Sequence, residues 1–91
     1  MRNTLKYVAV AGLLSLSSYG QKVQLAEADK QYEKYAYVDA IKTYERVFER
    51  GYKSADMLKK LGNAYYFQSK LEDANKWYTE LFAMNQEVEP E

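Results

Sequence analysis

Apolar residues recur at helical spacing through the second half of the chain. In residues 54–68 four of them fall at i, i+3, i+4 and i+7: Leu58, Leu61, Gly62 and Tyr65. In residues 71–84 the same spacing is repeated by Ala74, Trp77, Tyr78 and Leu81. Positions with this spacing share one face of an α-helix. The pattern therefore predicts two amphipathic helices that pack through their apolar stripes.

A similar stripe marks a helix earlier in the chain, over residues 38–50. Its apolar side carries Ala40, Ile41, Tyr44, Val47 and Phe48. Gly51 follows, at the place where a glycine commonly ends a helix in a left-handed conformation. Ser54 then stands where a side-chain oxygen can cap the next helix. These signals divide the chain into helices joined by short turns.

The helical segments belong to an internal repeat. Comparing position i with position i+34 gives the following matches without a gap: Ala28 with Gly62, Tyr32 with Tyr66, Asp39 with Asp73, Ala40 with Ala74, Lys42 with Lys76, Tyr44 with Tyr78, Val47 with Leu81 and Phe48 with Phe82. Small residues and aromatics thus recur at matched places. A fixed period of this length is typical of stacked helical repeats.

The period and its residues resemble the tetratricopeptide repeat, a helix-turn-helix unit. In that family certain positions are consistently large residues and others consistently small ones. In the second unit these positions are occupied by Leu58, Leu61, Gly62, Tyr65, Ala74, Tyr78 and Leu81. The resemblance implies an all-α fold, a short α-solenoid of two units at about 24–51 and 54–86. The two units would together make up one domain, from residue 21 to residue 86.

The first unit departs from the family pattern. Ala28 stands where the family usually has glycine, and Gln31 occupies the place that Tyr65 has in the second unit. Tyr32 supplies a ring one position later, which a slight rotation of the helix would accommodate. Both turns between paired helices also lack the family's common glycine, since Tyr35-Ala36 and Ser69-Lys70 occupy them.

Small residues explain how the paired helices approach one another. Ala28 or Gly62 on the first helix of a pair, and Ala40 or Ala74 on the second, have too little bulk to hold two backbones apart. A glycine inside a helix costs about 1 kcal/mol relative to alanine, so packing must compensate at Gly62. We expect bulky replacements there to force the pair open.

The N-terminal segment, residues 1–20, predicts a secretory signal peptide. Arg2 and Lys6 form a positive start, residues 7–16 form an apolar run, and Ser18-Tyr19-Gly20 offers small residues for cleavage. The alternative, a membrane anchor, is disfavoured because the run is well short of the roughly 20 residues that span a bilayer. The predicted location is therefore the periplasm or the outer membrane.

Composition excludes several classes of function. The chain has 13 basic and 13 acidic residues and contains no histidine and no cysteine. A neutral chain lacks the charge footprint of a nucleic-acid binder, and the usual zinc ligands, thiol nucleophile and proton shuttle are missing. No phosphate-binding loop or hydrolase motif is present either. We expect no enzymatic activity, no cofactor, no metal and no small-molecule substrate.

A candidate partner-binding surface follows from the resemblance, because first helices line the concave face of tetratricopeptide proteins. It consists of Asp29, Tyr32, Lys59, Asn63, Tyr66 and Phe67. Exposed rings beside polar groups suit peptide or helix recognition. The alternative is that Tyr66 and Phe67 pack on a neighbouring repeat. The remaining rings, Tyr65, Trp77, Tyr78 and Phe82, are predicted to be packing residues.

These observations predict a non-enzymatic scaffold or adaptor that holds a protein or peptide partner, expected to be an envelope protein of an assembly or secretion complex. Two units leave an apolar end, since stacked repeats generally need three or more. Residues 87–91 are therefore either an acidic tail or the start of a further helix, and self-association through the open end is an alternative. The order of signal peptide and repeats also resembles the N-terminal region of Bacteroidota OmpA-family proteins, which implies a second interpretation as a structural tether.

Overall fold

The computed structural model describes residues 20–88, with side chains up to residue 84. The predicted signal segment before residue 20 and residues 89–91 of the acidic tail lie outside the described residues. Helix α2 spans Tyr37–Glu49, α3 spans Ala55–Tyr66 and α4 spans Leu71–Val88. Residues 20–33 are helical as well, and this segment is called the first helix below.

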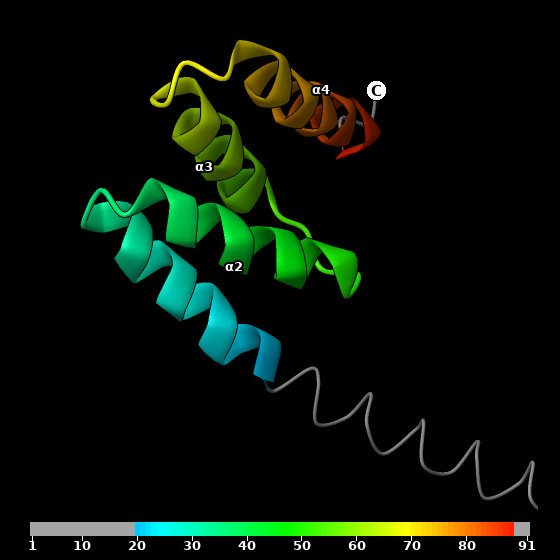
Figure 1. The fold of residues 1–91 in the computed structure, drawn as a ribbon. Coiled ribbons are helices and arrows are strands. Elements are labelled where there is room, and N and C mark those ends of the chain that lie inside the picture. The colour runs from blue at the N-terminus through cyan, green and yellow to red at the C-terminus, as the bar shows by residue number, and fades with distance from the viewer. Residues whose placement is uncertain (1–19, 89–91) are drawn as a thin grey trace, which may run out of the picture.

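The described residues form helices joined by short turns, with no strand anywhere between residues 20 and 88. The all-helical class expected from the sequence is therefore confirmed for this part of the chain. Figure 1 shows the helices stacked in chain order, with the first helix beside α2 and with α3 between α2 and α4. No described helix is both long enough and apolar enough to cross a membrane.

The turns inside the two helix pairs have the same hydrogen bonds at matched positions of the repeat. In the first, the Tyr35 amide donates to the Tyr32 carbonyl and the Ala36 amide donates to the Gln31 carbonyl. In the second, the amides of Ser69 and Lys70 donate to the carbonyls of Tyr66 and Tyr65. This pair of bonds is the Schellman arrangement that closes helix C-termini.

Both turns place a non-glycine residue in the left-handed region, because the Schellman arrangement requires a positive φ there. The φ angle is 66° at Tyr35 and 62° at Ser69. These two residues occupy the places where the sequence resemblance implied glycine. A side chain in this conformation costs roughly 1–2 kcal/mol. The backbone keeps the strained geometry although neither residue is a glycine.

The connection between α2 and α3 follows the sequence signals. Gly51 has φ 101° and its amide donates to the Phe48 carbonyl, so the predicted helix end is confirmed. Ser54 caps α3, because its hydroxyl accepts a hydrogen bond of 3.2 Å from the Met57 amide. Asp56 in the first turn of α3 suits the positive end of the helix dipole.

The core lies where the apolar stripes of the helices meet. Its buried members are Ala28, Ala40, Ile41, Tyr44, Val47, Met57, Leu58, Leu61, Ala64 and Trp77. Leu58, Leu61 and Tyr44 have no exposed surface, as the helical spacing predicted. Trp77 joins the two helix pairs, since its ring meets the Phe48 ring edge-on with centroids 4.9 Å apart.

Small residues allow close packing in both pairs, with a sharper constraint in the second. Ala28 and Ala40 are fully buried, and Ala74 is nearly so. At Gly62 a Cβ atom would lie only 2.3 Å from Cε1 of Tyr78. The glycine is therefore required by the tyrosine ring that lies over it, which explains why a helix tolerates its cost.

One packing prediction is wrong. Phe82 falls at core spacing in the sequence, yet 65 % of its surface is exposed. Its counterpart Phe48 is partly covered because Trp77 lies against it. Tyr65 and Tyr78 are half-buried, and Trp77 is buried, as expected of packing residues.

Candidate functional site

Aromatic rings gather at the end of the molecule formed by the two left-handed turns. Tyr37 is at the centre of this cluster. Its ring centroid lies 5.6 Å from that of Tyr32, 6.2 Å from that of Tyr35 and 5.1 Å from that of Phe67. Tyr66 extends the cluster, with its centroid 6.0 Å from that of Phe67. We call these five residues the aromatic surface.

Much of the aromatic surface faces outward. The exposed fraction is 78 % for Tyr35, 56 % for Tyr66 and 54 % for Phe67, whereas Tyr32 and Tyr37 are half-buried and pack on the core. Each ring could bury a further share of the roughly 150–250 Å² typical of an aromatic side chain. Contiguous exposed rings of this kind are characteristic of sites where another molecule binds.

The repeat geometry assembles the aromatic surface. Tyr32 and Tyr66 are matched positions of the repeat, each just before a left-handed turn, so the two turns present rings at equivalent places. Phe67 then reaches Tyr37 of the preceding pair. The surface therefore spans both helix pairs and depends on their relative placement.

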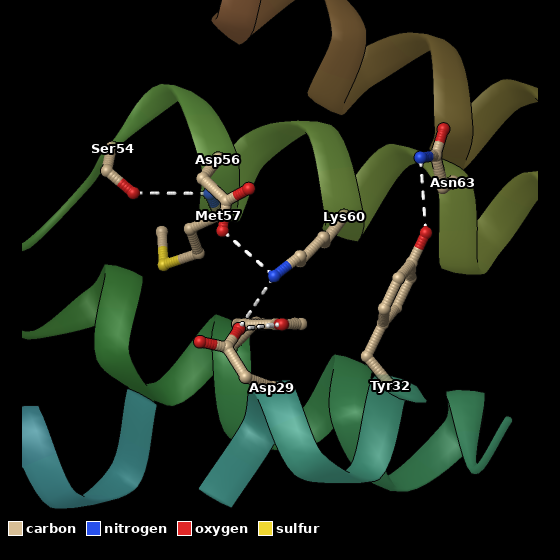
Figure 2. A network of polar contacts seen from close by, with 8 residues as sticks. Asp29, Tyr32, Ser54, Asp56, Met57, Lys60 and Asn63 are labelled. Atoms are coloured by element: carbon tan, nitrogen blue, oxygen red, sulfur yellow. Dashed lines mark hydrogen bonds and ion pairs between the residues drawn. The ribbon is translucent and has the colours of Figure 1, made fainter. Parts of the chain in front are cut away.

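A polar network fixes that placement. Figure 2 shows Lys60 of α3 between two carboxylates, one from its own helix and one from the first helix. Its Nζ lies 3.0 Å from Oδ2 of Asp56 and 3.3 Å from Oδ1 of Asp29. Nζ also lies 5.8 Å from the centroid of the Tyr32 ring. The lysine thus joins the first helix to α3.

The network changes the expected role of one lysine. Lys59, which the sequence placed in the candidate surface, is exposed, and the neighbouring Lys60 is the residue that meets Asp29. Burial lowers the pKa of Lys60, but the hydrogen bonds and charges of Asp56 and Asp29 outweigh burial and leave it raised. Lys60 is therefore charged and held in place at neutral pH.

Tyrosine hydroxyls extend the network to α2 and α4. The Tyr44 hydroxyl donates to Oδ1 of Asp29, and the Tyr78 hydroxyl donates to Oδ1 of Asn63 at 2.6 Å. These two bonds also join matched positions of the repeat, with an acid in the first pair and an amide in the second. The Asn63 amide in turn donates to the Tyr32 hydroxyl at 3.2 Å (Figure 2).

Burial and the carboxylate partner raise the pKa of Tyr44 far above its usual value of 10. The pKa of Tyr65 is raised in the same way, by burial and by the hydrogen bond that its hydroxyl donates to Glu45 of α2. Burial also raises the pKa of Tyr78. Ionising any of these hydroxyls would break a bond between helices.

Five of the six predicted surface residues fall into two groups, and the sixth, Lys59, is exposed. Asp29, Tyr32 and Asn63 hold helices together through hydrogen bonds, so their polar atoms already have partners. Tyr66 and Phe67 remain open to a ligand, and Phe67 contacts the neighbouring helix pair at the same time. Phe67 therefore combines the two alternatives, because its ring is exposed to a ligand and also packs on the neighbouring helix pair.

Two members of the aromatic surface were missed by sequence reasoning. Tyr35 lies in the turn of the first pair, off any apolar stripe. Tyr37 is the first residue of α2 and is three residues before Ala40 on the apolar stripe of that helix, but it precedes the helix predicted over residues 38–50. A signal was available in the density of rings around both turns. For Tyr35 this signal has no helical period, because the direction of a side chain in a turn depends on the local backbone, whereas Tyr37 has the period of α2.

Among residues 20–84 no group of three or more acidic side chains is placed to hold a metal ion. A cavity of about 220 Å³ is lined by Gln21, Lys22, Leu25 and Tyr52, at the opposite end of the helices from the turns. Its walls carry no pair of acid and base groups. A second cavity, of about 250 Å³, lies between α2 and α4 and is lined by Glu45, Phe48, Glu49, Lys76, Trp77 and Glu80.

Comparisons with protein-family models, with curated proteins and with solved structures each find no match to this chain.

Proposed function

We propose that this chain is a non-enzymatic interaction module of the tetratricopeptide type, which holds a protein partner through its aromatic surface. The observation that carries the proposal is the exposure of Tyr35, Tyr66 and Phe67 on a frame fixed by hydrogen bonds. Exposed rings that are already positioned lose little conformational freedom on binding, so more of their burial energy appears as affinity.

The repeat architecture supports this proposal. Backbone bonds of the two turns and the tyrosine bonds between paired helices recur with the period of the sequence repeat. Stacked helical pairs commonly serve as surfaces for other proteins. The polar network joins helices of this frame through Lys60 and Asn63, and the rings of Tyr35, Tyr66 and Phe67 are exposed beside it.

Export to the cell envelope is part of the proposal and rests on the sequence. The positive start, the apolar run and the small residues before position 21 support it. The partner is accordingly sought among envelope proteins. Localisation of the native chain by cell fractionation is the measurement that checks this step.

A double substitution tests the binding surface. The variant Tyr66→Ala with Phe67→Ala removes two exposed rings, so it should abolish co-purification of the partner from fractionated source cells. Because both side chains are about half exposed, the helical circular dichroism spectrum should remain that of the unaltered chain.

The matched control is Val23→Ala with Tyr52→Ala, which removes two exposed apolar side chains outside the aromatic surface. It should leave co-purification unchanged. The proposal fails if the ring variant keeps its partner while folded, or if both variants lose it equally.

A further inference from the structure

The cavity between α2 and α4 has acidic and aromatic walls. Its lining contains three glutamates and one lysine, so it carries two more negative charges than positive ones. The rings of Phe48 and Trp77 complete the lining and meet edge-on, with centroids 4.9 Å apart. None of the lining residues belongs to the aromatic surface. The cavity is therefore a separate candidate site, and its charge favours a cation.

The glutamates reach the cavity from both helices. Glu45 and Glu49 belong to α2, and Glu80 belongs to α4. Glu45 is half-buried, and its Oε2 accepts a hydrogen bond from the Tyr65 hydroxyl, which holds this carboxylate in place. Among the side chains that the structure describes, the ion pairs are those of Lys60, so none of the three glutamates is in one. Their charges are available to a ligand.

The aromatic wall of the cavity already contacts a cation of the chain itself. Nζ of Lys76 lies 5.1 Å from the centroid of the Trp77 ring. At such distances the face of an indole ring attracts a positive charge. Trp77 is buried, whereas Lys76 is exposed and is held in no ion pair among the described side chains. A ligand with a stronger hold on the carboxylates can therefore displace the lysine from the ring.

We propose that this cavity binds a guanidinium group in competition with Lys76. A guanidinium is planar, presents a fork of donors that matches carboxylates, stacks on aromatic rings and is more weakly hydrated than an ammonium. The cavity provides these partners, since carboxylates from two helices stand beside two rings. This inference goes beyond the aromatic surface and does not depend on it.

The size of the cavity fits this ligand. Its volume of about 250 Å³ is below the roughly 300–1,000 Å³ of pockets for drug-sized molecules, so it suits one group of side-chain size. A metal ion fits less well, because among residues 20–84 no three acidic side chains are placed to hold one. The guanidinium can belong to an arginine side chain of a peptide or to free arginine, and the two sources are separated by the probes below.

The test follows Trp77, because it lines the cavity and is the one tryptophan in the sequence. Its indole N–H signal in NMR spectra of the full chain reports binding there. The probes are Nα-acetyl-arginine amide, the matching citrulline amide, which has nearly the same shape without the charge, and the matching lysine amide. Free arginine is the fourth probe.

The arginine amide should shift the indole signal with a Kd below about 10 mM. The citrulline amide should bind at least about tenfold more weakly, because it lacks the charge, and the lysine amide about threefold more weakly, because it lacks the fork. Tighter binding of the arginine amide than of free arginine assigns the ligand to a peptide side chain, and the reverse order assigns it to the free amino acid. Both orders support the proposal.

Substitutions in the lining should act with opposite signs. Glu45→Gln keeps an acceptor for Tyr65 and removes a charge, so it should weaken binding of the arginine amide by about threefold or more, as should Glu80→Gln on the other helix. Lys76→Gln removes the competing ammonium and should tighten binding by about threefold. The matched control is Glu33→Gln, at an exposed glutamate of the first helix, which should leave the Kd unchanged.

Several results would overturn the proposal while circular dichroism shows a folded chain. They are the absence of an indole shift at about 10 mM arginine amide, equal binding of the citrulline or lysine amide, and weaker binding in Lys76→Gln. Tyr66→Ala with Phe67→Ala should leave arginine binding intact, so a failure of the aromatic surface and a failure of this cavity are told apart.

Discussion

The two helix pairs have one backbone plan and different surroundings. Tyr44 in the first pair and Tyr78 in the second make equivalent hydrogen bonds to the preceding helix. Tyr44 is fully buried and bonded to a carboxylate that also meets Lys60, whereas Tyr78 is half-buried and bonded to an amide. Equivalent positions thus have different surroundings, because the second pair lies against α2, whereas no helix among residues 20–88 lies on the outer side of α4.

The largest expected effect separates the two tyrosines. Tyr44→Ala removes a fully buried ring and should destabilise the chain by about 3–5 kcal/mol. Tyr78→Ala removes a half-buried ring and should cost less, about 1–2 kcal/mol, because solvent already reaches part of it and Gly62 gains space. Urea unfolding followed by circular dichroism measures both. Equal losses would break the comparison.

The close approach at Gly62 gives the next effect. Gly62→Ala puts a Cβ within 2.5 Å of two atoms of the Tyr78 ring. Despite its better helix propensity, alanine there should cost about 1–2 kcal/mol, since overpacking outweighs the propensity gain. Gly62→Leu should lower the melting temperature further, as should Ala74→Leu at the buried position on α4.

The reciprocal change in the first pair is the control. Ala28 already has a Cβ at the equivalent place and is fully buried. Ala28→Gly should therefore also destabilise the chain, by about 1–2 kcal/mol, from lost helix propensity and a lost buried methyl group. A stabilising result for Gly62→Ala would contradict the packing described at Tyr78.

High pH should act through Tyr44 more than through its repeat counterpart Tyr78, because Tyr44 donates to a carboxylate and Tyr78 to an amide. The pKa of Tyr44 is raised in the folded chain, so its contribution is full below about pH 10 and is lost as pH rises through the folded pKa. Lys60, whose pKa is also raised, adds a loss of the same sign. Each group can lower the free energy of unfolding by up to about 1.4 kcal/mol for each pH unit in this range.

Hydroxyl deletion makes this dependence specific. Tyr44→Phe should flatten the fall in unfolding free energy above about pH 10. Tyr78→Phe should flatten it less, because Tyr78 has no carboxylate partner. Urea titrations at several alkaline pH values give both slopes. If the slope is unchanged in Tyr44→Phe, Tyr44 does not contribute to the loss of stability at alkaline pH.

The smallest expected effect lies in the turns, where the two pairs match most closely. Ser69→Gly relieves a left-handed serine and should stabilise the chain by about 0.5–1 kcal/mol. Tyr35→Gly should gain less, since the Tyr35 ring packs edge-on against Tyr37 and is lost in the variant. Thermal melting resolves both changes. Destabilisation by Ser69→Gly would contradict the positive φ.

Helices and caps could be predicted from the sequence, because they depend on local spacing and on single residues. The stripe Leu58, Leu61, Gly62 predicted the buried face of α3, and Ser54 predicted its cap. Phe82 was misplaced for a related reason. Helical spacing says which face of a helix is apolar, and it does not say whether another element covers that face.

The candidate surface was predicted only in part. Tyr66 and Phe67 were found because they lie off the apolar stripe. Lys60 was overlooked in favour of Lys59, because one residue changes the direction of a helical side chain by about 100° and the choice depends on helix rotation. Tyr35 joins the cluster from a turn, where no helical period describes the direction of a side chain, and Tyr37 begins α2 one residue before the predicted helix.

Site-specific photo-cross-linking tests the central claim most directly, that the aromatic surface holds a protein partner. A benzoylphenylalanine replaces Phe67 in one variant and Tyr52 in another, both exposed and on separate parts of the chain. Irradiation of source cells should give one adduct of defined mass from position 67 and none from position 52. The same adducts from both positions, or none from position 67 in a folded chain, would contradict the account.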